Sequence, residues 1–284
     1  MKKNKLTIAY SSCPNDTFMF DALVNQKLDT GKLEFEPHIA DIEELNRLVQ
    51  EGYPDVSKIS FAVFPEISDR YSLLTSGSAV GYRNGPLVVS KYKIYPDELS
   101  NVKMAIPGKN TTANFLLTIL FPQVKDKKEY LFSDIEEAVL SNETDAGLLI
   151  HETRFTYEKK GLKKVTDLGE LWEKEFESPV PLGGIVIKRS LDPETKRNVQ
   201  NLVKKSVKFA FDRPGESRSY IKSYARELSD NVIYQHIDLY VNDFSVDLGE
   251  KGKKAIELLF EKGEERGLFK LKNDSIFSDK DNRR

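Results

Sequence analysis

His151 is the side chain of this sequence best placed to move protons. It directly follows the apolar run Gly147-Leu148-Leu149-Ile150, which predicts a buried strand over residues 146–150. The Cα of His151 should therefore lie where that strand leaves its sheet. An imidazole in such a place titrates near neutral pH and can act as a general base. The alternative is a packing or structural role, which is the commoner fate of a single histidine.

Three further polar segments resemble the one that begins at His151, because each directly follows an apolar run. They cover residues 11–17, 57–60 and 107–112, and the segment of His151 continues to residue 154. Ligands of open α/β sheets bind outside the carboxyl ends of the strands. The candidate substrate-binding residues in these segments are Asn15, Asp16, Lys58, Ile59, Ser60, Thr111, Thr112 and Arg154.

Each of these segments also has a purely structural interpretation. Residues 108–112 offer free N–H groups and two hydroxyls at a helix start, which suits a carboxylate or phosphate, but Thr111 or Thr112 can equally be a simple N-cap. The segment lacks the second glycine and the Lys-Ser/Thr pair of a phosphate-binding P-loop. Asn15 or Asp16 can cap a helix, and Lys58 can be a solvated loop lysine.

Metal and thiol chemistry have little support in the sequence. One cysteine, Cys13, and three histidines give neither a disulfide nor zinc-ligand spacing, so no metal site is expected. Pro14 follows Cys13 and has no backbone N–H for an oxyanion hole, which argues against a cysteine nucleophile. His236 lies in a helical pattern that predicts packing, and His38 has no evident partner.

Charge and composition narrow the class of protein. The chain of 284 residues has 43 Lys plus Arg against 45 Asp plus Glu, with both signs interspersed. It has no basic stripe for nucleic acid or for an anionic membrane surface. No segment resembles a signal peptide or a membrane span, so we expect a cytoplasmic protein that binds a small molecule rather than nucleic acid or membrane.

Short apolar runs alternate with helical patterns, which is typical of α/β units. We expect strands at 6–10, 33–36, 102–106 and 146–150, helices at 16–27 and 41–50, and a turn at 57–60. The C-terminal third is helical in pattern. Its predicted helices are 195–211, 215–228 and 248–266.

Two glycine-led apolar segments, 85–91 and 183–190, look alike and bracket about 95 residues of α/β pattern. We interpret them as crossover strands between two lobes. The first lobe is then discontinuous, with residues 1–88 plus 187–284, and the second, inserted lobe is 89–186, with a ligand cleft between them. Two contiguous domains split near residue 90 are the alternative, but residues 193–268 would then lack a sheet of their own.

Several segments together resemble the 1,4-dihydroxy-6-naphthoate synthase family, which belongs to the futalosine route to menaquinone. The most specific is 147–157, Gly-Leu-Leu-Ile-His-Glu-Thr-Arg-Phe-Thr-Tyr. The others are Ser12-Cys13-Pro14-Asn15-Asp16-Thr17-Phe18, Lys58-Ile59-Ser60, Asp69-Arg70-Tyr71, Pro107-Gly108 with Thr111-Thr112-Ala113, Asp167-Leu168-Gly169, Trp172-Glu173, 179–184, Glu227-Leu228-Ser229-Asp230 and Tyr240-Val241-Asn242. They span nearly the whole chain.

This resemblance implies a two-lobed fold like that of the periplasmic solute-binding proteins of type 2, used as a carbon–carbon lyase. The family cleaves cyclic dehypoxanthinyl futalosine to 1,4-dihydroxy-6-naphthoate and a sugar-derived fragment, without metal or organic cofactor. Its proton acceptor corresponds to His151, and its substrate-binding segments correspond to Lys58-Ile59-Ser60 and Thr111-Thr112.

Two other functions remain open at this point. One is a non-catalytic solute-binding protein for a small carboxylate, since the two-lobed clamp serves that role too. Such a receptor should carry a secretory signal or a lipid-anchor cysteine, which the sequence does not show. The other is the related enzyme of the same pathway that acts on chorismate, in which we would not expect the segment 147–157.

Overall fold

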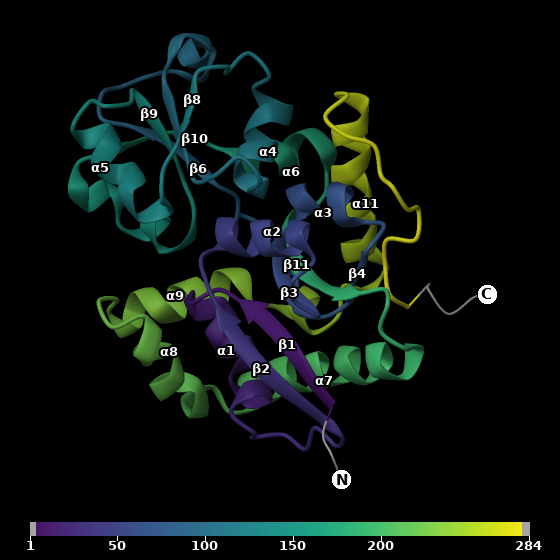
Figure 1. Ribbon diagram of the computed structural model, residues 1–284. Helices are drawn as coiled ribbons and strands as arrows, with labels where there is room; N and C mark the ends of the chain where they lie inside the picture. The colour runs from purple at the N-terminus through teal and green to yellow at the C-terminus, as the bar shows by residue number, and fades with distance from the viewer. Residues whose placement is uncertain (1–3, 280–284) are drawn as a thin grey trace.

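The computed structural model describes residues 4–279 and contains two β-sheets with helices around them (Figure 1). The strands of the first sheet, in spatial order, are β2 (Leu33–Ile39), β1 (Asn4–Tyr10), β3 (Val56–Ser60), β11 (Val180–Lys188) and β4 (Tyr71–Leu73), and β5 (Ala79–Gly81) also pairs with β11. Those of the second sheet are β10 (Lys163–Asp167), β6 (Leu87–Ser90), β9 (Ala146–Leu149), β7 (Met104–Ile106) and β8 (Lys127–Glu129).

Both sheets are mixed. β1 runs parallel to β2 and β3, whereas β11 is antiparallel to β3, β4 and β5. In the second sheet β7 is parallel to β8 and β9, and β6 is antiparallel to β9 and β10. The predicted α/β class is therefore confirmed, with antiparallel strands added where the chain passes between the sheets.

Helices from both ends of the chain cover the first sheet. α1 (Pro14–Val24) packs against α7 (Pro193–Asp212), α8 (Arg218–Tyr224) and α9 (Asp230–Tyr240), as the lower part of Figure 1 shows. Apolar side chains of β1 and α7, such as Ile8 and Val203, share one buried core, which stabilises this contact between distant parts of the sequence. The other helices around the first sheet are α2 (Ile42–Glu51), α3 (Phe64–Ile67), α10 (Asp243–Val246) and α11 (Gly249–Glu265).

The second sheet carries α4 (Thr112–Leu120), α5 (Ile135–Leu140) and α6 (Leu168–Phe176). α5 lies so close to β9 that a Cβ on Gly147 would come within 2.6 Å of the Ile135 side chain. Only glycine fits at that position of the strand. Short 3₁₀ helices connect the elements at Phe61–Val63, Pro96–Asn101, Phe132–Asp134, His151–Phe155, Tyr157–Lys160 and Pro214–Ser217.

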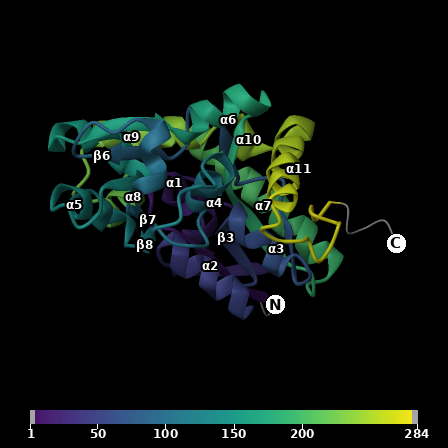
Figure 2. The same cartoon turned by 90° about the horizontal axis from the view of Figure 1, so that it is seen from above.

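The chain passes between the sheets twice, between β5 and β6 and between α6 and β11. The first passage packs closely on the start of α6, because a Cβ on Gly85 would lie 2.2 Å from the backbone nitrogen of Gly169. α11 stands beside α3 and α6 (Figures 1 and 2). The adjoining Phe269 packs against Phe115 of α4 with the rings tilted and their centroids 5.5 Å apart, so the C-terminal segment also contacts a helix that follows a strand of the second sheet.

Two sequence-based expectations about local structure are wrong. Residues 57–60 form the end of strand β3, not a turn, because their polar side chains find buried partners and the backbone pairs with β11. The expected helix 215–228 is broken: a 3₁₀ helix, Pro214–Ser217, precedes α8, which ends at Tyr224. The helix expected at 16–27 starts earlier and ends earlier, as α1.

Among residues 4–279, the structure has no helix that combines the length and the apolar character needed to cross a bilayer.

Candidate active site

A cleft between the two sheets collects most of the predicted site residues. The carboxyl ends of β1 and β3 point into it from the first sheet, and those of β7 and β9 from the second. Of the predicted set, the residues that line it are Asn15, Asp16, Lys58, Ile59, Ser60, Thr111, Thr112 and His151. Asn15 and His151, 136 positions apart in sequence, thus face one space, as the rule for the strand ends of open sheets predicts.

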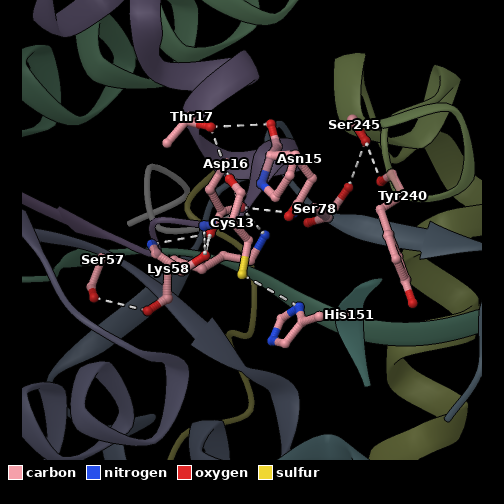
Figure 3. Close-up of polar contacts among 12 residues, drawn as sticks. Cys13, Asn15, Asp16, Thr17, Ser57, Lys58, Ser78, His151, Tyr240 and Ser245 are labelled. Carbon is pink, nitrogen blue, oxygen red and sulfur yellow. Dashed lines mark hydrogen bonds and ion pairs between the residues drawn. The ribbon is translucent and has the colours of Figure 1, made fainter. Parts of the chain in front are cut away.

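Asp16 is the centre of a buried polar network on the first-sheet side (Figure 3). Its carboxylate accepts hydrogen bonds from Lys58 Nζ at 2.8 Å, Asn15 Nδ2 at 2.9 Å and the Ser11 hydroxyl at 2.7 Å. The side chains of Lys58 and Asp16 are only 6% and 1% exposed. Loss of one partner would leave the other charge buried and unpaired, so this pair fixes the position of the whole network.

The network explains which structural interpretations fail. Lys58 is a buried strand residue, so it is not a solvated loop lysine. Neither Asn15 nor Asp16 caps α1, whose N-cap is Cys13 without a side-chain hydrogen bond. An ammonium group has three N–H donors and Asp16 takes one, so Lys58 retains donors for a ligand in the cleft.

His236 extends this network from the opposite direction. It lies on α9, is fully buried, and its Nε2 is 3.0 Å from Asn15 Oδ1. Because the amide nitrogen of Asn15 donates to Asp16, its oxygen must accept, and His236 Nε2 must carry the proton. Burial holds the pKa of His236 well below its usual value, so the ring is neutral. The sequence predicted only packing for His236 and did not predict this hydrogen bond.

His151 begins the 3₁₀ helix η4 (His151–Phe155) with a φ of +56°, in the left-handed region that side chains other than glycine seldom adopt. Such a conformation costs about 1–3 kcal/mol and persists only where the surroundings impose it. The ring lies nearly parallel to His236, with centroids 6.0 Å apart, and meets the edge of Phe132 at 5.0 Å. Cys13 Sγ is 3.5 Å from its Nδ1.

The electrostatics of His151 suit a base. Burial lowers its pKa, while the neighbouring Glu152 carboxylate acts in the opposite direction. Burial, followed by the charge of Glu152, raises the pKa of the Cys13 thiol, so Cys13 stays protonated. Figure 3 shows one ring nitrogen of His151 directed at Cys13 and the other turned away from it. If Nδ1 carries the proton, Nε2 is left with a lone pair and can accept a proton from a ligand.

Thr111 and Thr112 differ in role. Thr111 is the N-cap of α4: its hydroxyl donates to Gly108 O at 2.8 Å and accepts from Asn114 N at 3.3 Å. The hydroxyl of Thr112 accepts from Ala62 N at 3.4 Å and keeps its own donor. The first N–H groups of α4 have no acceptor within the helix, so the helix start offers several donors to an anion.

Arg154 lies away from the cleft lining. Its guanidinium donates to Gly85 O and, at 3.1 Å, to Asp167 Oδ2, which ties the passage between β5 and β6 to the end of β10. Ser11, from the predicted segment 11–17, also lines the cleft, whereas sequence reasoning missed two other lining residues, Asn84 and Tyr240. Nothing in their local pattern marks them, because each depends on contacts made by remote elements.

Within the described residues, 4–279, no three or more histidine, cysteine, aspartate or glutamate side chains group together as metal ligands would. The cleft instead offers an ammonium group, hydroxyls, amides and a neutral imidazole. That set can orient a polar ligand by hydrogen bonds and accept one proton from it.

Comparison with known proteins identifies the family of this chain. The family model described as menaquinone biosynthesis matches residues 6–265. The chain belongs to this family. Among curated members, a 1,4-dihydroxy-6-naphtoate synthase from Thermus thermophilus is 42% identical over 263 residues, 93% of this chain and 95% of that protein. One of the same name from Streptomyces coelicolor is 39% identical over 94% of this chain and 96% of its own length.

Solved structures confirm the fold expected for this menaquinone biosynthesis protein. Protein AF1704 from Archaeoglobus fulgidus superposes with a TM-score of 0.88 at 36% identity, covering 93% of this chain and 98% of its own. A ligand-binding component of an ABC-type import system from Staphylococcus aureus gives 0.72 at 16% identity, covering 97% and 96% of the two chains. The chain therefore has a periplasmic-binding-protein-like fold.

Proposed function

We propose that this protein is a carbon–carbon lyase that converts cyclic dehypoxanthinyl futalosine to 1,4-dihydroxy-6-naphthoate, acting in the cytoplasm on this small carboxylated substrate. Membership of the menaquinone biosynthesis family and two relatives named 1,4-dihydroxy-6-naphtoate synthase support the proposal. The observation that carries it is the neutral His151 imidazole, held at the cleft beside Cys13 and His236.

His151 is the general base in this proposal. Its Nε2 accepts a proton from a sugar hydroxyl or a carbon acid of the substrate during cleavage, and its lowered pKa keeps that nitrogen unprotonated near neutral pH. The strained backbone and the rings of Phe132 and His236 fix the orientation of the imidazole. A fixed base needs no reorganisation when the substrate arrives.

Binding of the substrate uses both sides of the cleft. The helix start at Thr112 and the Lys58 ammonium supply donors for the carboxylate, together with Ser60. Ile59, Ile150 and Leu182 give apolar walls for the bicyclic ring. Arg154 acts indirectly in this scheme, through the contact with Gly85 that holds the cleft-lining segment after β5.

The lobe assignment belongs to the same proposal: residues 1–88 plus 187–284 form one lobe and 89–186 the other. The first sheet takes its strands from residues 4–81 and 180–188 and the second from 87–167, which supports a discontinuous first lobe and favours a second boundary near residue 180 instead of 187. The packing of α7, α8 and α9 on α1 supports a discontinuous first lobe. A substrate held between the lobes then contacts residues of each.

Incubation of the purified protein with the cyclic substrate tests the function. We expect release of the naphthoate, followed by absorbance and mass. Chorismate is tested in parallel, because turnover of chorismate in place of the cyclic substrate would identify the related pathway enzyme. Tight binding of the cyclic substrate without any product would instead identify a solute-binding protein and contradict the proposal.

A further inference from the structure

Asn84 lines the cleft and has no hydrogen-bond partner for its amide. It lies in the passage between β5 and β6 and is 1% exposed. Among the described residues, neither its Oδ1 nor its Nδ2 meets a donor or acceptor. A buried amide left unpaired destabilises the fold, so such a group calls for an explanation.

The amide of Asn84 is nevertheless held in place. A Cβ on Gly81 would lie 2.9 Å from Asn84 Nδ2 and 3.1 Å from Asn242 Nδ2, so glycine at this position makes room for both amides. Asn242 is engaged elsewhere, with Val80 O at 2.9 Å and Phe244 N at 2.9 Å. On the other side, Gly85 packs against the backbone of Gly169. Asn84 is therefore closely surrounded by other described residues, but its amide forms no hydrogen bond with them.

Other asparagines near the cleft behave differently. Asn15 uses both halves of its amide, toward Asp16 and His236. Asn46 donates to Ser60 Oγ and Asn110 O and accepts from Ser60 N. These two amides are structural connectors, whereas that of Asn84 keeps a donor and an acceptor side by side.

We propose that Asn84 determines specificity by binding hydroxyl groups of the sugar-derived part of the substrate. A hydroxyl, or better a vicinal diol, can accept from Nδ2 and donate to Oδ1 at once. A carboxylate could satisfy only Nδ2 and would be repelled by Oδ1. The carboxylate thus belongs at the cationic and N–H donors of Lys58 and the α4 start, and the hydroxyls belong at Asn84.

This inference rests on the proposed function, and Asn84→Leu tests it because leucine has nearly the same shape without polar atoms. We expect the KM for the cyclic substrate to rise about tenfold, as for two lost hydrogen bonds. The naphthoate product lacks the sugar-derived part and so should not use Asn84. Its inhibition constant should therefore change less than about twofold. The melting temperature should stay the same or rise, because no protein hydrogen bond is lost.

Two further variants make the test decisive. Asn46→Leu removes an amide with three protein hydrogen bonds and should lower the melting temperature, which calibrates the stability measurement. Asn84→Ser is too short to reach the same ligand atoms and should raise the KM as well. It carries the test if the leucine variant does not fold.

Several results would overturn the inference. An unchanged KM in both Asn84 variants, or a lowered melting temperature with unchanged KM, would make Asn84 structural. Equal weakening of substrate and naphthoate would place the amide at the ring instead of at the hydroxyls. A wild-type protein that forms no naphthoate would contradict the proposed function itself, whereas wild-type turnover with unaffected variants contradicts this inference alone.

Discussion

The two walls of the cleft are built differently. The first-sheet wall, consisting of Ser11, Asn15, Asp16 and Lys58, is a closed network in which each side chain is bonded to another. The second-sheet wall, consisting of Thr112 and His151, has a strained backbone and free hydrogen-bonding capacity. Both walls follow the carboxyl ends of strands.

This difference indicates a division of labour. A buried network of this kind stabilises the fold and fixes positions, and in this one Lys58 still keeps donors for a ligand. Strain and unmet donors lower stability and are tolerated where a ligand or a reaction uses them. Changes in the first-sheet wall should therefore affect stability first, and changes in the second-sheet wall should affect catalysis or binding first.

His151→Asn should have the largest effect. Asparagine keeps a polar group of similar reach but cannot accept the proton, and a positioned base supplies about 10²–10⁴-fold in rate, or about 3–5 kcal/mol. We expect kcat to fall by that factor with KM and melting temperature nearly unchanged, as measured by steady-state kinetics and thermal unfolding.

The matched control for this variant is His38→Asn, since His38 lies on β2 outside the cleft lining and packs against Tyr53. Its kcat should equal that of the wild type. A His151 variant that keeps more than about a tenth of the wild-type rate would show a loss smaller than the removal of a general base usually causes. Proton transfer would then have to be assigned to another cleft residue.

Asp16→Asn should affect stability more than any other change in the first-sheet wall. It leaves the Lys58 ammonium buried without its counter-ion, a situation that usually costs about 3–5 kcal/mol. Urea denaturation should show this loss as a lower midpoint. As a control, Glu143→Gln breaks the exposed Lys128–Glu143 pair and should leave the midpoint unchanged. A fully stable Asp16 variant would remove the contrast between the walls.

The pH dependence of kcat/KM separates His151 from the network. Because burial lowers the pKa of His151, the base becomes half protonated at a pH below its ordinary pKa of 6.5. We expect kcat/KM to be constant around neutrality and to fall about tenfold per pH unit on the acid side, with a midpoint below 6.5. A midpoint above 6.5 would mean that Glu152 outweighs burial, or that another group is the base.

The sequence predicts which segments form this site but not the contacts between them. The apolar run before His151 and the polar segments after β1 and β7 identify strand ends, and a sheet brings strand ends together whatever the details of the loops. The α/β alternation is likewise a local property. For this reason the fold could be predicted from residue pattern and family resemblance, and so could the main polar groups of the cleft, from Asn15, Asp16 and Lys58 to Thr112 and His151.

What the sequence could not predict depends on contacts between remote residues. His236 looks like a packing residue because its neighbours on α9 are apolar, yet its ring reaches Asn15, 221 positions away. Residues 57–60 look like a turn because three of the four are polar, yet pairing with β11 and the burial of Lys58 against Asp16 make them a strand. Arg154 belongs to the segment of His151 but its partner, Asp167, turns it away from the cleft.

The adjacent threonines at the start of α4 provide the finest test of the two-wall comparison. Thr112→Val removes a hydroxyl whose donor is free to bind the substrate carboxylate, and hydrogen bonds to charged groups contribute about 1.5 kcal/mol or more. The KM should rise about tenfold, with only a small loss of stability because the protein hydrogen bond that is given up, from Ala62 N at 3.4 Å, is long. Thr111→Val removes the N-cap of α4 and should lower the free energy of unfolding by about 1 kcal/mol, with a much smaller change in KM.

The two variants make the same Thr-to-Val change one residue apart. Opposite effects on KM and on stability would therefore assign binding to one hydroxyl and folding to the other. If both raised the KM equally, the substrate would be bound by the whole helix start, and the contrast between a structural and a functional threonine would be wrong.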